Sequence, residues 1–239
     1  MKKVVVVIAI TFVVCTSCIY KFAAIRGNGS LVTCELSVSK FDRIKCVGYP
    51  AVRFFESDEY RVVYTVDSNL EEWVDIYTKN NELHIGTKDK FGNKSLFFSK
   101  YLVDVYCPAL KSVTISGSGS FETVDDISVS SFDTKISGSG KIVGTVFCND
   151  FSSKISGSGK ITVLGASNDA DISISGSGRF TGNEFEIKKA NITISGSGKA
   201  NVFVTDFMKV KISGSGNITY SGEPKIESKV TGSGKIKKN

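Results

Sequence analysis

Seven copies of one five-residue word recur through the second half of this chain and constrain its fold more than any other feature. The word is Ile-Ser-Gly-Ser-Gly in the first six copies and Val-Thr-Gly-Ser-Gly in the last. Successive copies start about 18–21 residues apart, which is close to one turn of a β-solenoid and too short for a propeller blade or a helical repeat. The copies begin at Ile115, Ile136, Ile155, Ile174, Ile194, Ile212 and Val230.

Two apolar positions flank the glycines of every copy. The first is the leading Ile or Val, and the second lies two residues past the second glycine. Equivalent residues of neighbouring solenoid turns lie about 4.8 Å apart, so each position predicts an internal ladder of stacked side chains. We therefore expect an all-β fold, a single-stranded parallel β-helix with about 18–21 residues per turn. The second ladder comprises Phe121, Ile142, Ile161, Phe180, Ala200, Ile218 and Ile236.

The glycines of each copy are predicted to form a corner of the turn. A sharp corner repeated at the same place requires positive φ or close approach of stacked backbones, and glycine accepts both. The serines beside them are expected to bond turn backbone groups or the serine of the next turn. The predicted turn glycines are Gly117, Gly119, Gly138, Gly140, Gly157, Gly159, Gly176, Gly178, Gly196, Gly198, Gly214, Gly216, Gly232 and Gly234.

Residues 1–18 have the pattern of a lipoprotein-type signal peptide. Two lysines precede an apolar stretch at residues 4–14, which is too short to span a bilayer as a helix. The following Cys15-Thr16-Ser17-Cys18 resembles a bacterial lipoprotein cleavage box, although Cys15 stands where an aliphatic residue is usual. We expect Cys18 to carry the lipid and residues 19–29 to form a tether. Ordinary secretion, with cleavage near Ser17 or Ala24, is the alternative.

The rest of the mature chain is expected to form one β-helix in two parts. Residues 30–112 are its less regular beginning, and residues 113–239 are the part with the Gly-Ser-Gly repeat. The first part has β-rich runs at residues 61–66, 82–86 and 101–106, separated by turn-forming segments. A separate small β-sandwich in the first part is the alternative.

Several segments together resemble one known family. With the serial Ser-Gly-Ser-Gly words, they are similar to the putative auto-transporter adhesin, head GIN domain family, across about residues 30–237. The resemblance implies a right-handed parallel β-helix in an exported protein or lipoprotein, and it supplies no catalytic residues. The segments are VSKFDRI at 38–44, DEYRV at 58–62, DSNL at 67–70, ELHIG at 82–86 and PALKSV at 108–113.

Charge and cysteine content limit the partners of the chain. The net charge of +6 is too mild for a nucleic-acid binder, so neither DNA nor RNA is expected as a partner. The cysteines beyond the signal segment match no zinc-binding spacing. We expect free thiols that pack as small hydrophobic residues, with a disulfide bridge as the alternative. These residues are Cys34, Cys46, Cys107 and Cys148.

The chain shows no convincing catalytic or metal-binding pattern, so no cofactor or metal is expected. Asp150 and Asp169, each preceded by Asn, are expected to stack at one bend as a turn motif rather than to form a catalytic acid pair. His84 is the only histidine, and its strand-like surroundings indicate a structural residue rather than part of a triad. The glycine words also lack the aspartates of calcium-binding repeats.

The position directly after each Gly-Ser-Gly is the most suggestive candidate site, because five of its seven residues are cationic. Stacked at the turn spacing, they would form a basic stripe able to meet anionic glycans or lipid head groups. The alternative is a charged surface that only keeps the sheet soluble. The stripe comprises Lys141, Lys160, Arg179, Lys199 and Lys235, while Ser120 and Asn217 occupy the other two positions.

These observations together predict a non-enzymatic binding or adhesion module of the cell envelope or surface. We expect a lipid anchor in the outer membrane, with the protein facing the periplasm or the cell exterior. One alternative is a carbohydrate-active enzyme on the same scaffold. The other is a lipid-binding or envelope-assembly component with a groove at residues 91–101, although strand core or a long turn explains Phe97 and Phe98 better. A homo-oligomer formed through the solenoid end stays open.

Overall fold

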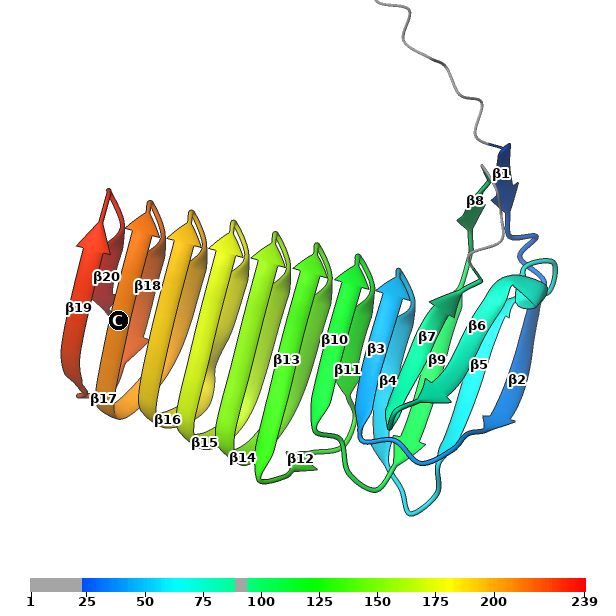
Figure 1. Cartoon of the computed structure of the whole chain (residues 1–239), viewed down its shortest axis with the longest axis horizontal. Helices are drawn as coiled ribbons and strands as arrows, with labels where there is room; N and C mark the ends of the chain where they lie inside the picture. The colour runs from blue at the N-terminus through cyan, green and yellow to red at the C-terminus, as the bar shows by residue number, and fades with distance from the viewer. Residues whose placement is uncertain (1–22, 89–93) are drawn as a thin grey trace, which may run out of the picture.

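The computed structural model describes residues 23–88 and 94–239, and nearly all of them lie in strands or the turns between strands. The main sheet has 18 strands and is wound into a β-solenoid of about 7 turns (Figure 1). The prediction of an all-β parallel solenoid is confirmed. No helix among the described residues is long and apolar enough to cross a membrane.

The repeat region supplies the regular turns. Each long strand runs through one whole turn, pairs in parallel with the next, and ends at the first glycine of the word, as in the pairing of Ile155 with Ile174. The long strands are β14 (Lys141–Gly157), β15 (Lys160–Gly176), β16 (Arg179–Gly196) and β17 (Lys199–Gly214). Shorter strands complete the region: β13 (Ser131–Gly138), β18 (Asn217–Ser221), β19 (Lys225–Thr231) and β20 (Lys235–Lys238).

Both predicted ladders fill the interior of the solenoid. The leading isoleucines and the second apolar positions are buried in every turn from Ile115 and Phe121 through Ile212 and Ile218. The last turn differs, because Val230 is 41% exposed and Ile236 is half-buried. Strands β19 and β20 pair on one side only, with β17 and β18.

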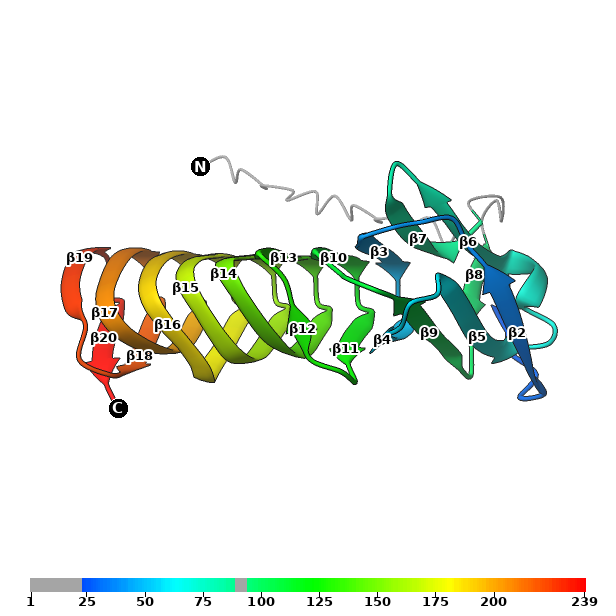
Figure 2. The same ribbon diagram turned by 90° about the horizontal axis from the view of Figure 1, so that it is seen from below.

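The first part of the chain belongs to the same sheet, but its turns are not stacked in chain order. Strands β3 (Arg43–Gly48) and β4 (Ala51–Glu56) lie directly beside β10 (Ser112–Gly117) and β11 (Ser120–Thr123). Strands β7 (Glu82–Thr87) and β9 (Tyr101–Cys107) form the next turn outward, beyond β3 and β4. The chain then passes back over the β3–β4 turn to begin the repeat (Figures 1 and 2).

Antiparallel strands end the parallel ladder at the N-terminal side. Strand β2 (Leu31–Ser37) pairs with β5 (Arg61–Asp67), which pairs with β9. Strand β6 (Val74–Lys79) pairs with β7 and follows a short 3-10 turn, η1 (Glu71–Trp73). Strands β2 to β7 and β9 therefore form two solenoid turns and an antiparallel end cap within a single sheet.

A two-stranded parallel ribbon projects from this end of the molecule (Figure 1). It consists of β1 (Ala23–Arg26) and β8 (Lys94–Phe97). The buried Asp67 holds its base, because the carboxylate accepts hydrogen bonds from Gly29 N at 2.8 Å, Ser99 N at 2.7 Å and Ser99 Oγ at 2.6 Å. Burial raises the pKa of Asp67, but these hydrogen bonds lower it by more, so the pKa lies below its ordinary value.

All four described cysteines are unpaired, as expected. Cys46 and Cys107 are buried in the core, whereas Cys34 and Cys148 are only half-buried. Burial raises the pKa of the Cys46 and Cys107 thiols to about 12. Both buried thiols are therefore protonated near neutral pH.

Candidate functional site

The corner of each turn needs its two glycines for different reasons. Gly157, the first glycine of its word, has φ +116°, and a Cβ added there would lie 2.6 Å from the carbonyl oxygen of Gly138 in the preceding turn. At the second glycine, Gly159, a Cβ would lie 2.5 Å from Cγ2 of Ile136. The first position therefore requires glycine because of its positive φ and the nearby backbone of the preceding turn. The second position requires glycine because an isoleucine side chain of the preceding turn occupies the space.

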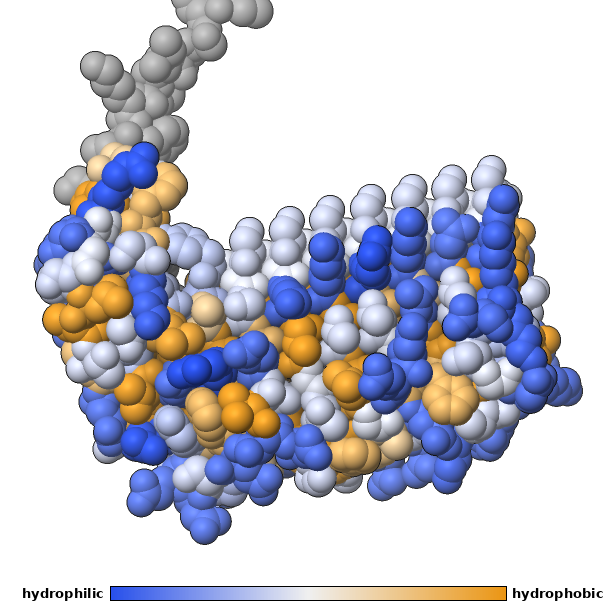
Figure 3. Space-filling model, turned by 180° about the vertical axis from the view of Figure 1, so that it is seen from behind, coloured by the Kyte–Doolittle hydropathy of each residue, from blue (hydrophilic) through white to orange (hydrophobic). Residues whose placement is uncertain are grey.

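The corner serines do not bond the backbone or one another as expected. Backbone groups of adjacent turns pair directly, as in Ser158 N to Gly138 O at 2.9 Å and Lys160 N to Gly140 O at 2.9 Å. Among the described residues, no hydrogen bond from a corner serine hydroxyl is found, and the serines between the paired glycines are exposed. Figure 3 shows them as a regular pale comb along one edge of the molecule.

The five cations of the stripe lie in one register, directly beside this edge. Lys141 pairs with Lys160, Lys160 with Arg179, and Arg179 with Lys199. Asn217 follows Lys199 and precedes Lys235. All five cationic side chains are exposed, and Figure 3 shows a row of hydrophilic side chains below the pale comb. The structure thus brings together all the residues of the predicted stripe.

The stripe lies in surroundings that provide little neutralising charge. Within residues 23–88 and 94–239, none of the five cations takes part in an ion pair. The neighbouring outward column on the same face is neutral between its two ends; it runs through Glu122, Val143, Thr162, Thr181, Asn201, Thr219 and Lys237. Two unit charges about 4.8 Å apart in water repel by roughly 0.9 kcal/mol, and salt screens part of this. Bound anions would relieve that repulsion.

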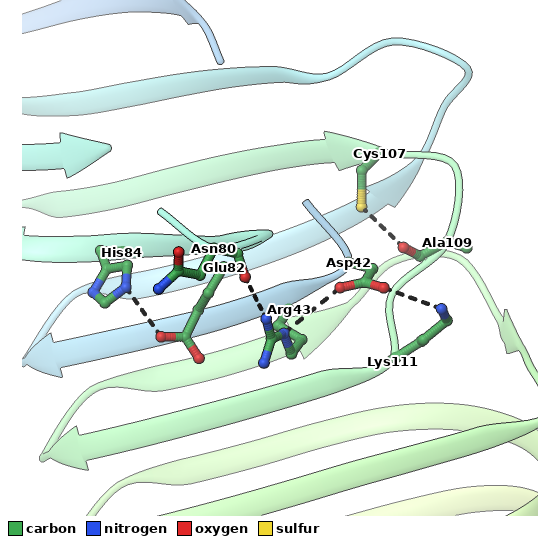
Figure 4. Close-up of polar contacts among 8 residues, drawn as sticks. All are labelled: Asp42, Arg43, Asn80, Glu82, His84, Cys107, Ala109 and Lys111. Carbon is green, nitrogen blue, oxygen red and sulfur yellow. Dashed lines mark hydrogen bonds and ion pairs between the residues drawn. The ribbon is translucent and has the colours of Figure 1, made fainter. Parts of the chain in front are cut away.

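The polar cluster around His84 is built for structure (Figure 4). The Nε2 atom of His84 lies 3.0 Å from Glu82, and its ring stacks on Tyr77 with centroids 4.8 Å apart. Asp42 is 3.0 Å from Lys111 and 3.7 Å from Arg43. The backbones of Asp42 and Lys111 also hydrogen-bond at 2.7 Å, so this cluster joins the β3–β4 turn to the first turn of the repeat.

The stacked Asn-Asp bend is present, but its two aspartates do not line a pocket. Asp150 is in register with Asp169, and Nδ2 of Asn168 donates to Oδ1 of Asn149 at 2.9 Å. Both aspartates are exposed, and neither lines the adjacent groove. In the part of the chain that the structure describes, no cluster of His, Cys, Asp or Glu has the arrangement of a metal site.

Two features of the cationic face could not be read from the repeat. Cys46 to Pro50 form a further corner, because Gly48 pairs with Gly117, but the long segment between Cys46 and Ile115 hides the period. The second is the pair of Arg53 and Asp104, whose side chains share two hydrogen bonds of 2.7 Å. The sequence signal that could have predicted the additional corner is the pattern apolar-x-Gly-x-small-x-apolar at residues 46–52.

Cys18, the predicted lipidation site, lies outside the described residues. Strand β1 begins shortly after it in the sequence, at Ala23. The ribbon of β1 and β8 projects on the side of the molecule that carries the corners (Figures 1 and 3).

Most of this chain matches one known protein family. A model of the family described as putative auto-transporter adhesin, head GIN domain, matches residues 40–224. The chain belongs to this family. This head GIN domain protein therefore has the family expected from its sequence, and the adhesin description of that family suggests a surface or exported protein. It matches no curated protein sequence.

Solved structures show the same fold as this head GIN domain protein. A protein from Parabacteroides distasonis, described as a putative lipid binding protein, is 27% identical with a TM-score of 0.77; the match covers 90% of this chain and 99% of that one. A putative adhesin from Parabacteroides merdae is 25% identical with a TM-score of 0.73, covering 91% and 99% of the two chains. A putative adhesin from Bacteroides fragilis has a TM-score of 0.84 at 19% identity, covering 90% and 100%, and supports the fold alone.

Proposed function

We propose that this protein is a non-enzymatic binding module of the cell envelope or surface, whose cationic stripe engages anionic groups of a glycan or of lipid heads. The observation that carries the proposal is the stacking of Lys141, Lys160, Arg179 and Lys199 on four consecutive turns. A row of like charges at this spacing costs stability in the free protein. It becomes favourable when anions lie along it.

The immediate surroundings of the stripe support a ligand rather than a role in solubility alone. A surface that serves solubility mixes both signs of charge, as the other face does where exposed Asp133 and Lys135 lie two residues apart, with the buried Thr134 between them. Along the stripe, the neighbouring column carries Val143, Thr162 and Thr181 instead of acids. The serine comb beside it adds free hydroxyl groups, which are suited to hydrogen-bond sugar or phosphate oxygens.

The proposed module is held at the membrane by a lipid on Cys18. Because β1 begins at Ala23, so soon after Cys18, the anchor would lie close to the ribbon that projects on the side of the corners (Figure 1). The Asp67 hydrogen bonds fix the base of that ribbon. Incorporation of labelled palmitate by the full chain, and its loss in Cys18→Ser, is the expected result; labelling that persists in the variant would contradict the anchor.

Charge reversal tests the stripe directly. We expect K141E/K160E/R179E to lose binding to immobilised polygalacturonate and to phosphatidylglycerol vesicles by about 100-fold or more, since each cation near an anionic surface contributes about 1 kcal/mol. The matched control is K135E/K154E/K211E, which makes the same change in charge on exposed, outward positions of the other face. The control should retain most of the binding, and both variants should keep the wild-type circular-dichroism spectrum.

Comparing the two triple variants distinguishes binding at the stripe from attraction by the net charge of the whole protein. Equal losses in the two triple variants would show that only net charge matters and would refute the stripe. Failure of the wild type to bind either polyanion at low salt would refute it as well. Dextran and phosphatidylcholine vesicles, which carry no net charge, are the control ligands.

A further inference from the structure

A groove crosses the bends that lie opposite the corners, where four successive turns meet beside β12 (Ile127–Ser128). It is lined by residues 128–130, 147–149 and 166–168, with Glu186 and Lys188 at one end. Its volume is about 750 Å³, within the range of about 300–1,000 Å³ that is usual for small-molecule sites. Figure 2 views the molecule from the side on which β12, β14 and β15 turn.

The groove arises from irregularities that the repeat does not contain. Strand β12 has only two residues and pairs with Val146 and Phe147 of β14. The backbone at Val129 then bonds to Phe147 O at 3.1 Å, and Asn149 N bonds to Ser130 O at 3.0 Å. These bonds hold the edge of the groove in place.

One wall of the groove presents an aromatic ring to solvent. Phe147 is 44% exposed and takes part in none of the ring contacts found among the described residues. Its register neighbours are Ser128 on one side and Ala166 on the other. Because both neighbours have small side chains, the ring borders a notch over Ala166, with Glu186 on the following turn.

The other wall is polar and largely uncharged. The amide of Asn168 donates to Oδ1 of Asn149 at 2.9 Å, which leaves the Asn149 amide nitrogen and the Asn168 oxygen available to a ligand. The floor is fixed by Ser167, whose buried hydroxyl contacts Asn149 O at 3.1 Å and Asp169 O at 2.7 Å. Glu186 and Lys188 add one charge of each sign, so the groove has no net preference for an ion.

We propose that this groove binds a neutral oligosaccharide, independently of the cationic stripe. The Phe147 ring would pack against the C–H face of one sugar ring in the notch over Ala166. Hydroxyl groups of the sugar would donate to the Glu186 carboxylate and exchange hydrogen bonds with the two asparagines. A lipid chain fits this lining poorly, because it would bury the amides and the carboxylate without partners.

The experiment measures binding of the full chain, in a polyoxyethylene detergent, to immobilised cellohexaose, chitohexaose, mannohexaose and laminarihexaose. We expect at least one hexasaccharide to bind, with little change between low and high NaCl concentration, as for an uncharged ligand. Phe147→Ala and Ala166→Leu should each weaken that binding by about tenfold or more, through loss of the ring and filling of the notch. Glu186→Gln should weaken it less, because one carboxylate oxygen is replaced by an amide.

Controls distinguish this groove from other surfaces of the protein. Phe97→Ala removes a phenylalanine of similar exposure, 49%, at the N-terminal ribbon and should leave binding unchanged. The stripe variant K141E/K160E/R179E should also bind the hexasaccharide normally, so failure of the stripe hypothesis and failure of the groove hypothesis give different results. Absence of binding to all four probes, or binding unchanged in both Phe147→Ala and Ala166→Leu, would overturn the proposal.

Discussion

Alanine substitutions at three glycines separate the two reasons why the corner requires glycine. Gly157 combines φ +116° with a carbonyl oxygen 2.6 Å from its added Cβ. Gly48, in the corner of the β3–β4 turn, has φ +90°, but nothing lies within 4 Å of an added Cβ. Gly159 is free of the φ constraint, yet its Cβ would meet Ile136 Cγ2 at 2.5 Å.

These geometries set the expected order of stability. A non-glycine residue held at positive φ costs about 1–3 kcal/mol, and forcing an extra carbon into a packed interior costs about 1–3 kcal/mol. Gly48→Ala and Gly159→Ala should therefore each lower the free energy of unfolding by about 1–3 kcal/mol. Gly157→Ala incurs both costs, so its loss should exceed that of either other variant, because the clash is with backbone that cannot rotate away.

Urea unfolding followed by far-ultraviolet circular dichroism provides the measurement. Gly86→Ala is the control, because Gly86 has no positive φ and its added Cβ would make an ordinary contact of 3.4 Å with Val47; we expect it to be neutral or stabilising by about 0.5 kcal/mol. Transition slopes must be compared along with midpoints, because stacked turns can unfold in parts. If Gly157→Ala were no less stable than Gly48→Ala, the argument from backbone spacing would be refuted.

Three further predictions concern charge and burial. Arg179→Gln should raise stability by roughly 0.5–1 kcal/mol at low salt by removing repulsion from two cationic neighbours, and the gain should vanish in about 1 M NaCl; a gain that persists there would exclude charge as its cause. Asp67→Asn should destabilise the protein at neutral pH, because an amide nitrogen would face hydrogen-bond donors. Since the folded pKa of Asp67 is lowered, its contribution is complete above the unfolded value of about 3.9 and is lost as pH falls through the folded value. The difference in the free energy of unfolding between the wild type and Asp67→Asn should thus shrink as the pH falls below that unfolded value. A difference that stays constant with pH would refute stabilisation by the ionised carboxylate. Cys46 and Cys107, whose burial raises the pKa to about 12, should react with a thiol reagent at mildly alkaline pH only after unfolding; rapid reaction in the native protein would show that the core opens.

The repeat region could be predicted closely because the length of its sequence repeat equals the length of one solenoid turn. Every copy of the word places Ile or Val near the end of a strand and glycine at the corner, so one copy predicts the next. The ladder that begins at Ile115 and the stripe that begins at Lys141 follow from spacing alone. The serine hydroxyls were the exception, since backbone groups of adjacent turns satisfied the bonds assigned to them.

The N-terminal part was predictable as strands but not as an arrangement. Its β-rich runs are strands in the structure, and the short turn at Glu71–Trp73 interrupts them where the chain passes from β5 to β6. The placement of β7 and β9 outside β3 and β4 depends on contacts between residues far apart in the chain. The sequence has no repeat from which this order of the turns could be predicted.

The two candidate surfaces differ in the same way. The stripe is a property of one position in the repeat, and its charge is therefore visible in the sequence. The groove depends on Phe147, Ala166 and Glu186 occupying one column, together with the short β12. Those residues have no common spacing motif, and only the fold brings them together.

The sequence by itself thus determined the solenoid, its corners and its basic stripe, because parallel stacking converts the regular period of the Gly-Ser-Gly word into columns of like side chains. The tertiary structure alone decided the antiparallel end cap, the non-sequential order of the first turns and the groove opposite the corners. The physical reason is that a regular spacing of similar side chains in the sequence indicates only which residues stack between adjacent turns. Insertions and irregular bends change which turns are neighbours without leaving a period of their own.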